Sequence, residues 1–361
     1  MKILCTALFL FSLSGLSADE FWHYKNYFNN KPEQREVLKN FKYLIENSAV
    51  PIKSKSSKPV SIVMVYPENQ VSDYWRRNIM ALKKRLNENA IKYSLELIPT
   101  PTGGSIKRES AKILEAIKKN PDYLIFTLNV KEHAKIINQT LAYSPIKLIL
   151  LNITTPLKIW DQNKPFFYVG FDHEEGTQKI IDEVRRRLPN GGRYVVLYHS
   201  KGYVSRMRGD YAIQELSKDK NWKLVSRYYT DAKVSKVNRA MKDILKRNKN
   251  IDLVLSCSTD ISLAAQKFKS KHAFLLNGWG GGSAEIKSLT KESLGIDFSV
   301  MRMNDDSAIA IAEAIKLDVQ GEKQKIPDIF SGEMVLINKD TSQEQLDHYT
   351  KRAFRYSNEE K

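Results

Sequence analysis

The sequence predicts an α/β protein made of two doubly wound parallel-sheet domains. Short apolar runs typical of buried strands alternate with longer stretches whose apolar residues recur every three or four positions, as in amphipathic helices. Strands that alternate with helices in this way form βαβ units and pair in parallel. The alternation occurs as two successive series, and a chain of 361 residues is long enough for two such domains.

Residues 1–18 are predicted to be a secretory signal peptide. Lys2 supplies a positive charge, residues 3–16 are largely apolar, and we expect cleavage after Ala18. The apolar stretch is too short to span a bilayer comfortably, and no other segment is long and apolar enough to do so. We therefore expect a protein of the periplasm without a membrane-spanning helix.

Cleavage there would leave Cys257 as the one cysteine, so the core and not an internal disulfide is expected to stabilise the protein. The formal net charge of +17 would by itself suggest a nucleic-acid partner. Export argues against that partner, and the lysines are spread along most predicted helices, as on a solvated face. We expect no nucleic acid, whereas attraction to an anionic membrane surface or an acidic partner stays open.

The first series of strands follows an aromatic-rich leader, a helical stretch that ends at Glu46 and a polar linker at residues 53–59. Its strands are continuous apolar runs, as expected when helices cover both faces of a parallel sheet. The predicted strands are Ser61–Val65, Ser94–Ile98, Tyr123–Leu128 and Lys147–Asn152. The helices between them are predicted at Asp73–Asn89, Ile106–Lys119 and Lys131–Ala142.

The second series is predicted to begin with a strand near Phe166 and to form the second sheet. Its strands are Phe166–Gly170, Tyr194–Tyr198, Leu224–Tyr229, Ile251–Ser256 and Ala273–Leu276. Its helices are Glu174–Arg187, Arg208–Ser217, Val237–Arg247 and Ile261–Lys269. A further strand is predicted to give way to a helix within Asp297–Asp306.

Sequence motifs for catalysis and metal binding are absent. The chain has no HExxH, GxSxG or Walker sequence and no paired CxxC, and its six histidines lack metal-ligand spacing. The glycine-rich stretch Asn277–Ser283 is not a dinucleotide loop, because the third glycine of that motif would fall at Ser283. It is either a flexible strand-to-helix turn or, as we favour, a glycine-rich loop that lets an exposed Trp279 approach a ligand closely. We expect neither a metal nor a cofactor, and no enzymatic activity.

Polar and aromatic side chains gather at the predicted carboxyl ends of the strands, where open α/β sheets bind ligands. The candidate ligand-binding residues are Gln70, Ser72, Trp75, Asn152, Arg208, Thr259, Trp279 and Arg302. Each has an ordinary structural alternative, such as an N-cap for Ser72 or a core position for Trp75. Two arginines in one cleft predict a negatively charged ligand, because an unpaired buried arginine is costly to desolvate and charge-assisted hydrogen bonds are strong.

Seven motifs give the chain a specific resemblance. They are YPENQVSDYW, DYLIFTL, LNITTP, YVGFDHEEG, CSTD, NGWGGGSAE and VMRMNDD. With these motifs the chain, after its leader, closely resembles the LuxP-type autoinducer-2 receptors of the type I periplasmic binding protein family. The resemblance implies two α/β domains joined by three chain crossings near residues 157–166, 298–302 and 329–333, with the ligand cleft between them. One domain would comprise residues 19–160 and 301–330, and the other residues 161–300 and 331–361.

The resemblance also implies a ligand and a partner. The ligand is autoinducer-2 as a furanosyl borate diester, whose negative charge Arg208 and Arg302 would neutralise. Trp75 and Trp279 would cover the ring faces, and the other four candidate residues would bind hydroxyls and ring oxygens. The partner is the periplasmic domain of a membrane-bound hybrid sensor histidine kinase of the LuxQ type.

Two other classes of protein are weighed against this receptor. A solute-binding protein of an importer, for a pentose or for autoinducer-2 without borate, would share the fold but carry no boron and dock to a permease. An enzyme acting on a small sugar would need a general acid and base in the cleft, and the eight candidate residues include no carboxylate or histidine.

Overall fold

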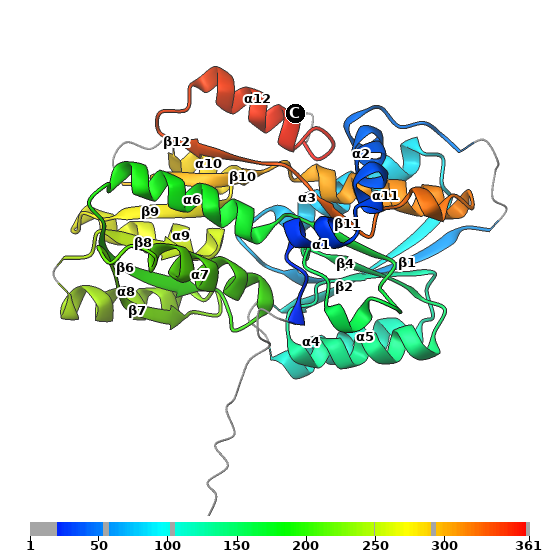
Figure 1. The fold of residues 1–361 in the computed structure, drawn as a ribbon, viewed down its shortest axis with the longest axis horizontal. Coiled ribbons are helices and arrows are strands. Elements are labelled where there is room, and N and C mark those ends of the chain that lie inside the picture. The colour runs from blue at the N-terminus through cyan, green and yellow to red at the C-terminus, as the bar shows by residue number, and fades with distance from the viewer. Residues whose placement is uncertain (1–19, 53–57, 102–104, 249, 290–293, 359–361) are drawn as a thin grey trace, which may run out of the picture.

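The computed structural model describes residues 20–52, 58–101, 105–248, 250–289 and 294–358, which form two α/β domains, each around a six-stranded sheet (Figure 1). The predicted fold class is confirmed. The expected signal peptide and most of the 53–59 linker lie outside the described residues. Within the described ranges, no helix is both long enough and apolar enough to cross a membrane.

The first sheet is parallel throughout, with the strand order β11-β5-β4-β3-β1-β2. Its strands are β1 (Val60–Glu68), β2 (Tyr93–Pro101), β3 (Tyr123–Phe126), β4 (Lys147–Leu151), β5 (Phe167–Gly170) and β11 (Ile329–Ser331). The central strands β3 and β5 are buried at every residue, which explains their continuous apolar sequence.

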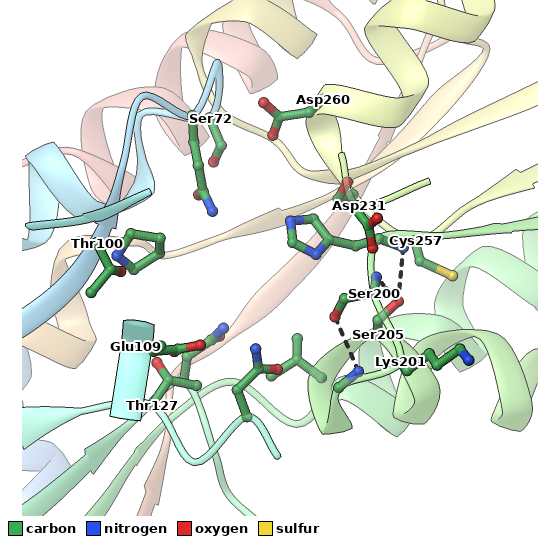
Figure 2. Close-up of a pocket in the computed structure, with 18 of the residues that line it drawn as sticks. Ser72, Thr100, Glu109, Thr127, Ser200, Lys201, Ser205, Asp231, Cys257 and Asp260 are labelled. Atoms are coloured by element: carbon green, nitrogen blue, oxygen red, sulfur yellow. Dashed lines mark hydrogen bonds between the residues drawn. The ribbon is translucent and has the colours of Figure 1, made fainter. Parts of the chain in front are cut away.

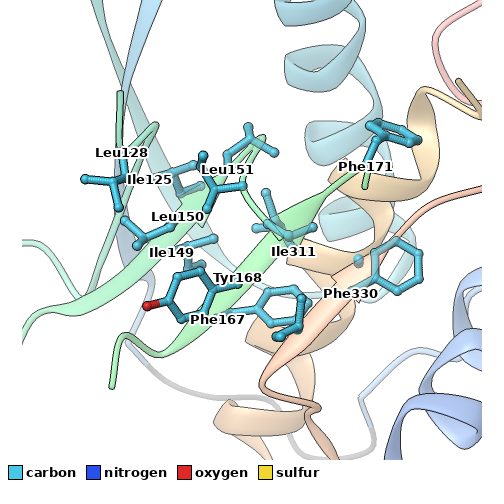
Figure 3. Close-up of a cluster of buried hydrophobic side chains, with 14 of the residues drawn as sticks. Ile125, Leu128, Ile149, Leu150, Leu151, Phe167, Tyr168, Phe171, Ile311 and Phe330 are labelled. Carbon is cyan, nitrogen blue, oxygen red and sulfur yellow. The ribbon is translucent and has the colours of Figure 1, made fainter. Parts of the chain in front are cut away.

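Helices cover both faces of the first sheet (Figure 1). One face carries α2 (Glu33–Glu46), α3 (Tyr74–Glu88) and α11 (Asp305–Val319), and the other carries α4 (Ile106–Lys118) and α5 (Lys131–Tyr143). A short helix, α1 (Tyr24–Asn30), precedes α2. Figure 3 shows the core on the α11 side, where Ile311 packs close to Phe167 and Phe330.

The second sheet has the order β12-β10-β9-β8-β6-β7, and its one antiparallel pair is β10 with β12. Its strands are β6 (Gly192–Tyr198), β7 (Trp222–Tyr229), β8 (Leu253–Ser256), β9 (Leu275–Gly280), β10 (Phe298–Arg302) and β12 (Met334–Asn338). Its helices are α6 (His173–Arg187), α7 (Tyr203–Leu216), α8 (Val234–Arg247), α9 (Thr259–Ala265), α10 (Ser283–Leu289) and α12 (Gln343–Ala353). Alternate residues of β6 face different cores, with Val196 on one side and Val195 on the other.

The first crossing between the domains differs from the prediction. The strand at 167–170 was assigned to the second series, but β5 pairs with β4 and β11 and belongs to the first sheet. The link from β4 to β5 holds only a short 3₁₀ turn at Lys158–Trp160, and without an intervening helix the two strands read as members of separate series. The first domain therefore continues to Gly170, past the expected limit at residue 160, and the chain crosses after β5 and not at 157–166.

The other two crossings lie at or beside the predicted segments. β10 belongs to the second sheet, so the chain crosses just after Arg302 and enters α11, which packs on α3 in the first domain. The third crossing joins β11 to β12 at residues 332–333, inside the predicted 329–333. The strands β11 and β12 were not predicted as strands; β11 is only three residues long, and β12 is the antiparallel edge strand of its sheet.

Candidate ligand-binding site

A cavity of about 570 Å³ lies between the two domains, at the carboxyl ends of strands from both sheets. Figure 2 shows Thr100, Glu109 and Thr127 of the first domain on one side, and Ser200, Lys201 and Asp231 of the second domain on the other. All eight candidate residues line this cavity: Gln70, Ser72, Trp75, Asn152, Arg208, Thr259, Trp279 and Arg302. Its volume is typical of a site for a small molecule.

The turn between β1 and α3 brings Gln70, Ser72 and Trp75 to the cavity. Asp73, not Ser72, is the N-cap residue of α3, and the Ser72 hydroxyl accepts only a long hydrogen bond of 3.4 Å from the Tyr74 amide. Trp75 is 6% exposed, so it is both a buried residue and part of the cavity wall. The two interpretations of Trp75 are therefore compatible.

Asn152 follows β4 in a left-handed backbone conformation, with φ of 67°. Its amide donates to the Val169 carbonyl at 2.7 Å, while its side-chain Oδ1 is buried without a partner among the described residues. A Cβ atom on Gly170 would lie 2.8 Å from the Asn152 Cα atom, so only glycine fits beside this turn. The close approach holds the Asn152 side chain at the edge of the first sheet.

Trp279 was predicted to be exposed on a glycine-rich loop, and its exposure is wrong. It lies in β9, is 1% exposed, and its carbonyl accepts a hydrogen bond of 3.2 Å from the Thr259 hydroxyl. The Glu285 carboxylate accepts from the amides of Trp279 at 2.9 Å and Gly281 at 2.7 Å, which fixes the turn after the strand. The glycines thus accommodate a turn that is fixed by hydrogen bonds. The sequence analysis did not identify Glu285 as the residue that fixes this turn. The Trp279 Nε1 atom is buried without a partner among the described residues.

Arg208 lies in the second turn of α7, which begins at Tyr203 and not at Arg208 as predicted. The guanidinium lies over the Trp279 ring, 3.5 Å from the ring centroid, and Nη1 donates to the Cys257 carbonyl at 2.8 Å. The side chain is 6% exposed. Burial, together with the nearby positive charge of Arg302, lowers the pKa of Arg208 to about 9.

Arg302 ends β10 and is also 6% exposed. Its guanidinium lies over the Tyr74 ring at 4.3 Å from the centroid, and burial lowers the pKa of Arg302. Its Nε atom has no partner within the described part of the chain. Gly280, with φ of 135°, leaves room for it, since a Cβ atom there would lie 2.7 Å from Nη2 of Arg302. In the described ranges, neither Arg208 nor Arg302 forms an ion pair with a carboxylate.

Unpartnered polar atoms concentrate around the cavity. Six residues that line it have a buried side-chain nitrogen or oxygen with no hydrogen-bond partner in the described structure: Tyr74, Thr127, Asn152, Ser258, Trp279 and Arg302. Buried polar groups in folded proteins almost always have a partner. The set contains donors, acceptors and hydroxyls, so a bound molecule that both accepts and donates hydrogen bonds would satisfy it.

The cavity also contains ionisable groups that the sequence did not place there. Glu109, His199, Asp231 and Asp260 line it, so carboxylates and histidines are present in the cavity although the eight candidate residues include none. Asp231 pairs with Lys236, and the Asp260 Oδ1 atom accepts from the Val71 amide at 2.8 Å across the cleft. Burial raises the pKa of Glu109 to about 7 and lowers that of His199 to about 4.

Hydrogen bonds join the domains directly beside the cavity, and two of them involve acidic side chains. One is the Asp260–Val71 hydrogen bond, between α9 and the turn after β1. The other connects Asp73 at the start of α3 with Ser283 at the start of α10, whose hydroxyl donates to the Asp73 Oδ2 atom at 2.9 Å. Both acidic side chains thus bridge the cleft without any bound molecule.

Comparison with known proteins identifies a family and a fold. The model of the periplasmic binding protein domain matches residues 62–323. A solute-binding protein of an ABC transporter from Actinobacillus succinogenes, with bound D-allose, is 17% identical; the match covers 81% of this chain and all of that one, with a TM-score of 0.63.

Two further solved structures are similar at the level of fold. A solute-binding protein from Bacillus halodurans with bound myo-inositol is 17% identical over 83% of this chain and all of that one, with a TM-score of 0.66. A chain in a XylFII–LytSN complex is 16% identical over 78% of this chain and 98% of that one, with a TM-score of 0.66.

Proposed function

This chain belongs to the periplasmic binding protein domain family, and we propose that it is a receptor for autoinducer-2 of the LuxP type. It acts in the periplasm, binds its ligand as a furanosyl borate diester, and is a binding protein and not an enzyme. The ligand occupies the cavity between the domains and is held by the eight residues Gln70, Ser72, Trp75, Asn152, Arg208, Thr259, Trp279 and Arg302.

One observation carries the proposal: Arg208 and Arg302 reach the same enclosed cavity, each 6% exposed, and neither has a carboxylate partner in the described structure. A buried charge without compensation costs several kcal/mol, at least about 3, when its partner is missing. An anionic ligand between the two guanidinium groups supplies the compensation, whereas a neutral sugar leaves both charges unpaired. The tetrahedral borate of the diester carries one negative charge at the centre of a diol-derived ring system.

The remaining groups suit the uncharged parts of such a ligand. Trp75 and Trp279 provide aromatic surfaces on the cavity wall. The unpartnered Asn152 Oδ1 atom accepts hydrogen bonds, and the unpartnered Trp279 Nε1 atom donates them. This combination of ring faces and single polar atoms recognises hydroxyls and ring oxygens.

The site also supports a signalling role, because its residues come from both domains. Trp75 and Asn152 belong to the first, Arg208 and Trp279 to the second, and Arg302 stands at a crossing. A ligand that contacts both domains binds the closed form best and shifts the population toward it. We propose that closure is reported to the periplasmic domain of a hybrid sensor histidine kinase of the LuxQ type. The XylFII–LytSN complex provides an example of this fold in a complex with another named component.

A solute-binding protein of an importer is the second candidate function. Solute-binding proteins of the same fold have been solved with D-allose and myo-inositol bound. These neutral ligands favour a sugar or autoinducer-2 without borate. The two candidates differ in the charge of the ligand, so the arginine pair separates them.

The decisive experiment measures boron. Ligand-free protein is incubated with autoinducer-2 with or without borate, freed of unbound ligand, and analysed for elemental boron and by calorimetric titration. We expect one boron per protein and much tighter binding in the presence of borate, with D-allose and myo-inositol as neutral controls. Saturable binding of a boron-free ligand with the same affinity at all borate concentrations would contradict the proposed receptor function. It would favour the second candidate, a solute-binding protein of an importer.

A further inference from the structure

His173 is a buried histidine that contacts ligand-site residues of both domains. It is the first residue of α6, directly after the first crossing, and is 2% exposed. Its Nε2 atom lies 3.1 Å from the Asn152 carbonyl of the first domain. Its Nδ1 atom lies 3.4 Å from both Nε and Nη2 of Arg208 in the second domain, and its ring meets the Trp279 ring at 5.3 Å between centroids.

These contacts define the protonation state of the ring. A carbonyl only accepts and a guanidinium only donates, so Nε2 must carry the proton and Nδ1 must be the acceptor. Burial and the nearby positive charges of Arg208 and Arg302 keep the pKa of His173 well below its ordinary value, which agrees with a neutral ring. A second proton on Nδ1 would remove the acceptor and place a third positive charge in the site.

The consequence for Arg208 is a fixed orientation. One Nη1 hydrogen is used by the Cys257 carbonyl, and the Nε–Nη2 edge faces His173. The flat face of the guanidinium is occupied by the Trp279 ring. Of the five N–H groups of an arginine, one on Nη1 and one on Nη2 remain for a ligand.

The consequence for Asn152 is equally direct. Its carbonyl accepts from His173 Nε2, and its backbone has the left-handed conformation that turns the side chain to the cavity. The His173 ring therefore touches the residue that offers an acceptor from the first domain and the residue that offers positive charge from the second.

We propose that His173 is a positioning residue that aligns the anion-binding Arg208 with the Asn152 turn across the crossing, so that the two domains present one site for a charged ligand. The inference rests on the proposed function, because it concerns the recognition of a negative charge. His173 itself does not line the cavity and acts through its two partners.

The test uses the full-length mature protein and three substitutions with different hydrogen-bonding patterns. His173→Asn keeps an acceptor near the position of Nδ1, His173→Gln keeps a donor near the position of Nε2, and His173→Leu keeps neither. Binding of autoinducer-2 is titrated with and without borate, and thermal unfolding is recorded without ligand. Thr177→Ala is the matched control, because Thr177 is a buried residue on the same helix that does not line the cavity.

We expect His173→Leu to weaken binding with borate about tenfold or more, as for the loss of a hydrogen bond to a charged group. His173→Asn should recover most of that loss. Binding without borate should change much less, because Arg208 is proposed to bind the negative charge that only the borated ligand carries. Thr177→Ala should leave the ratio of the two affinities unchanged. Equal losses with and without borate, or no advantage of His173→Asn over His173→Leu, would overturn the inference.

Nitrogen-15 NMR of the histidine rings gives a readout that is independent of the ligand. Wild-type His173 should show a protonated Nε2, an unprotonated Nδ1 and no titration at neutral pH. The opposite tautomer or a charged ring would refute the positioning role even if the protein binds borate. If wild type binds no borated ligand while the ring has the expected tautomer, the proposed function fails and the arrangement around His173 stands.

Discussion

Two buried arginine environments in this protein differ in what compensates the charge. Arg85 on α3 is 1% exposed; its Nε atom bonds Glu313 at 2.6 Å, and its other nitrogens donate to the carbonyls of Leu44 and Asn47 and to the Tyr356 hydroxyl. Arg302 is nearly as buried, yet among the described residues its guanidinium lies over the rings of Tyr74 and Phe171 and pairs with no carboxylate. A complete set of partners indicates a structural role, whereas an incomplete set beside a cavity indicates a missing ligand.

The largest effect is expected from a substitution that disrupts the compensated environment of Arg85. Arg85→Met removes one of the two cations that pair with the buried Glu313 carboxylate, the other being Lys316, and it also removes the donor to three further acceptors. Removing one partner of a buried pair costs about 3–5 kcal/mol, so the free energy of unfolding should fall by about that amount. Chemical denaturation of the ligand-free protein measures it. An exposed pair, Lys112 with Glu115, provides the control: Lys112→Met should change the stability by less than about 1 kcal/mol. A loss equally small for Arg85→Met would remove the basis of the comparison.

Arg302→Met should have the opposite pattern. The ligand-free protein should keep its stability or gain some, because an uncompensated charge is removed from the interior. Binding of autoinducer-2 with borate should weaken by about 2–5 kcal/mol, since the anion loses one of its two cations. Calorimetry measures the affinity, and solution scattering measures whether ligand still compacts the protein. Unchanged affinity would mean that the ligand is not an anion, and Arg208→Met should behave in parallel.

A smaller effect is expected from the aromatic wall. Trp75→Ala removes an aromatic surface that lines the cavity and should weaken binding by about 1–3 kcal/mol. The loss should be similar with and without borate, because a ring face does not recognise charge, and this distinguishes the tryptophan from the arginines. Titration under both conditions gives the ratio. A loss confined to the borated ligand would assign Trp75 to the charged part of the site.

Glu109 extends the comparison from buried arginines to a partly buried carboxylate of the cavity. We expect its substitution to have the smallest effect. Burial raises its pKa to about 7 in the folded protein, so folding favours its protonated form. Its contribution to stability is complete below the unfolded pKa of about 4.5 and is lost as the pH rises through about 7. Glu109→Gln, which stays neutral, should therefore gain stability relative to wild type between pH 5 and pH 8. Thermal unfolding without ligand measures this; a constant difference across that range would show that Glu109 is not perturbed.

The regular parts of the fold were predictable because their patterns are local. The runs that became β1, β3 and β4 are apolar throughout, and the helix after β1 has its apolar residues at helical spacing, so the positions agree within a few residues. The sheet to which β5 belongs was not predictable in this way. Its membership depends on pairing with β11, which lies far along the chain.

The site was predictable in composition but not in its supporting interactions. The eight candidate residues follow strand ends, and parallel sheets bring such ends to one edge. His173 and Glu285 gave no such indication, because each acts through neighbours that only the folded chain provides. Trp279 was misjudged because glycines on both sides suggested flexibility, whereas the Glu285 carboxylate fixes that turn. Its burial of 99% also means that its replacement by alanine would test stability as much as binding.

The hydrogen bonds from the Val71 amide to Asp260 and from the Ser283 hydroxyl to Asp73 affect the sensitivity of the proposed receptor. They join the two domains directly, so they favour the closed arrangement and raise the fraction of empty protein that is closed. A larger closed fraction lowers the ligand concentration needed for a half-maximal response and raises the signal in its absence. Neither side chain is among the eight candidate ligand-binding residues, yet both would thus tune the ligand concentration at which the proposed receptor responds. That threshold can therefore change at Asp73 and Asp260 without a change in those eight residues.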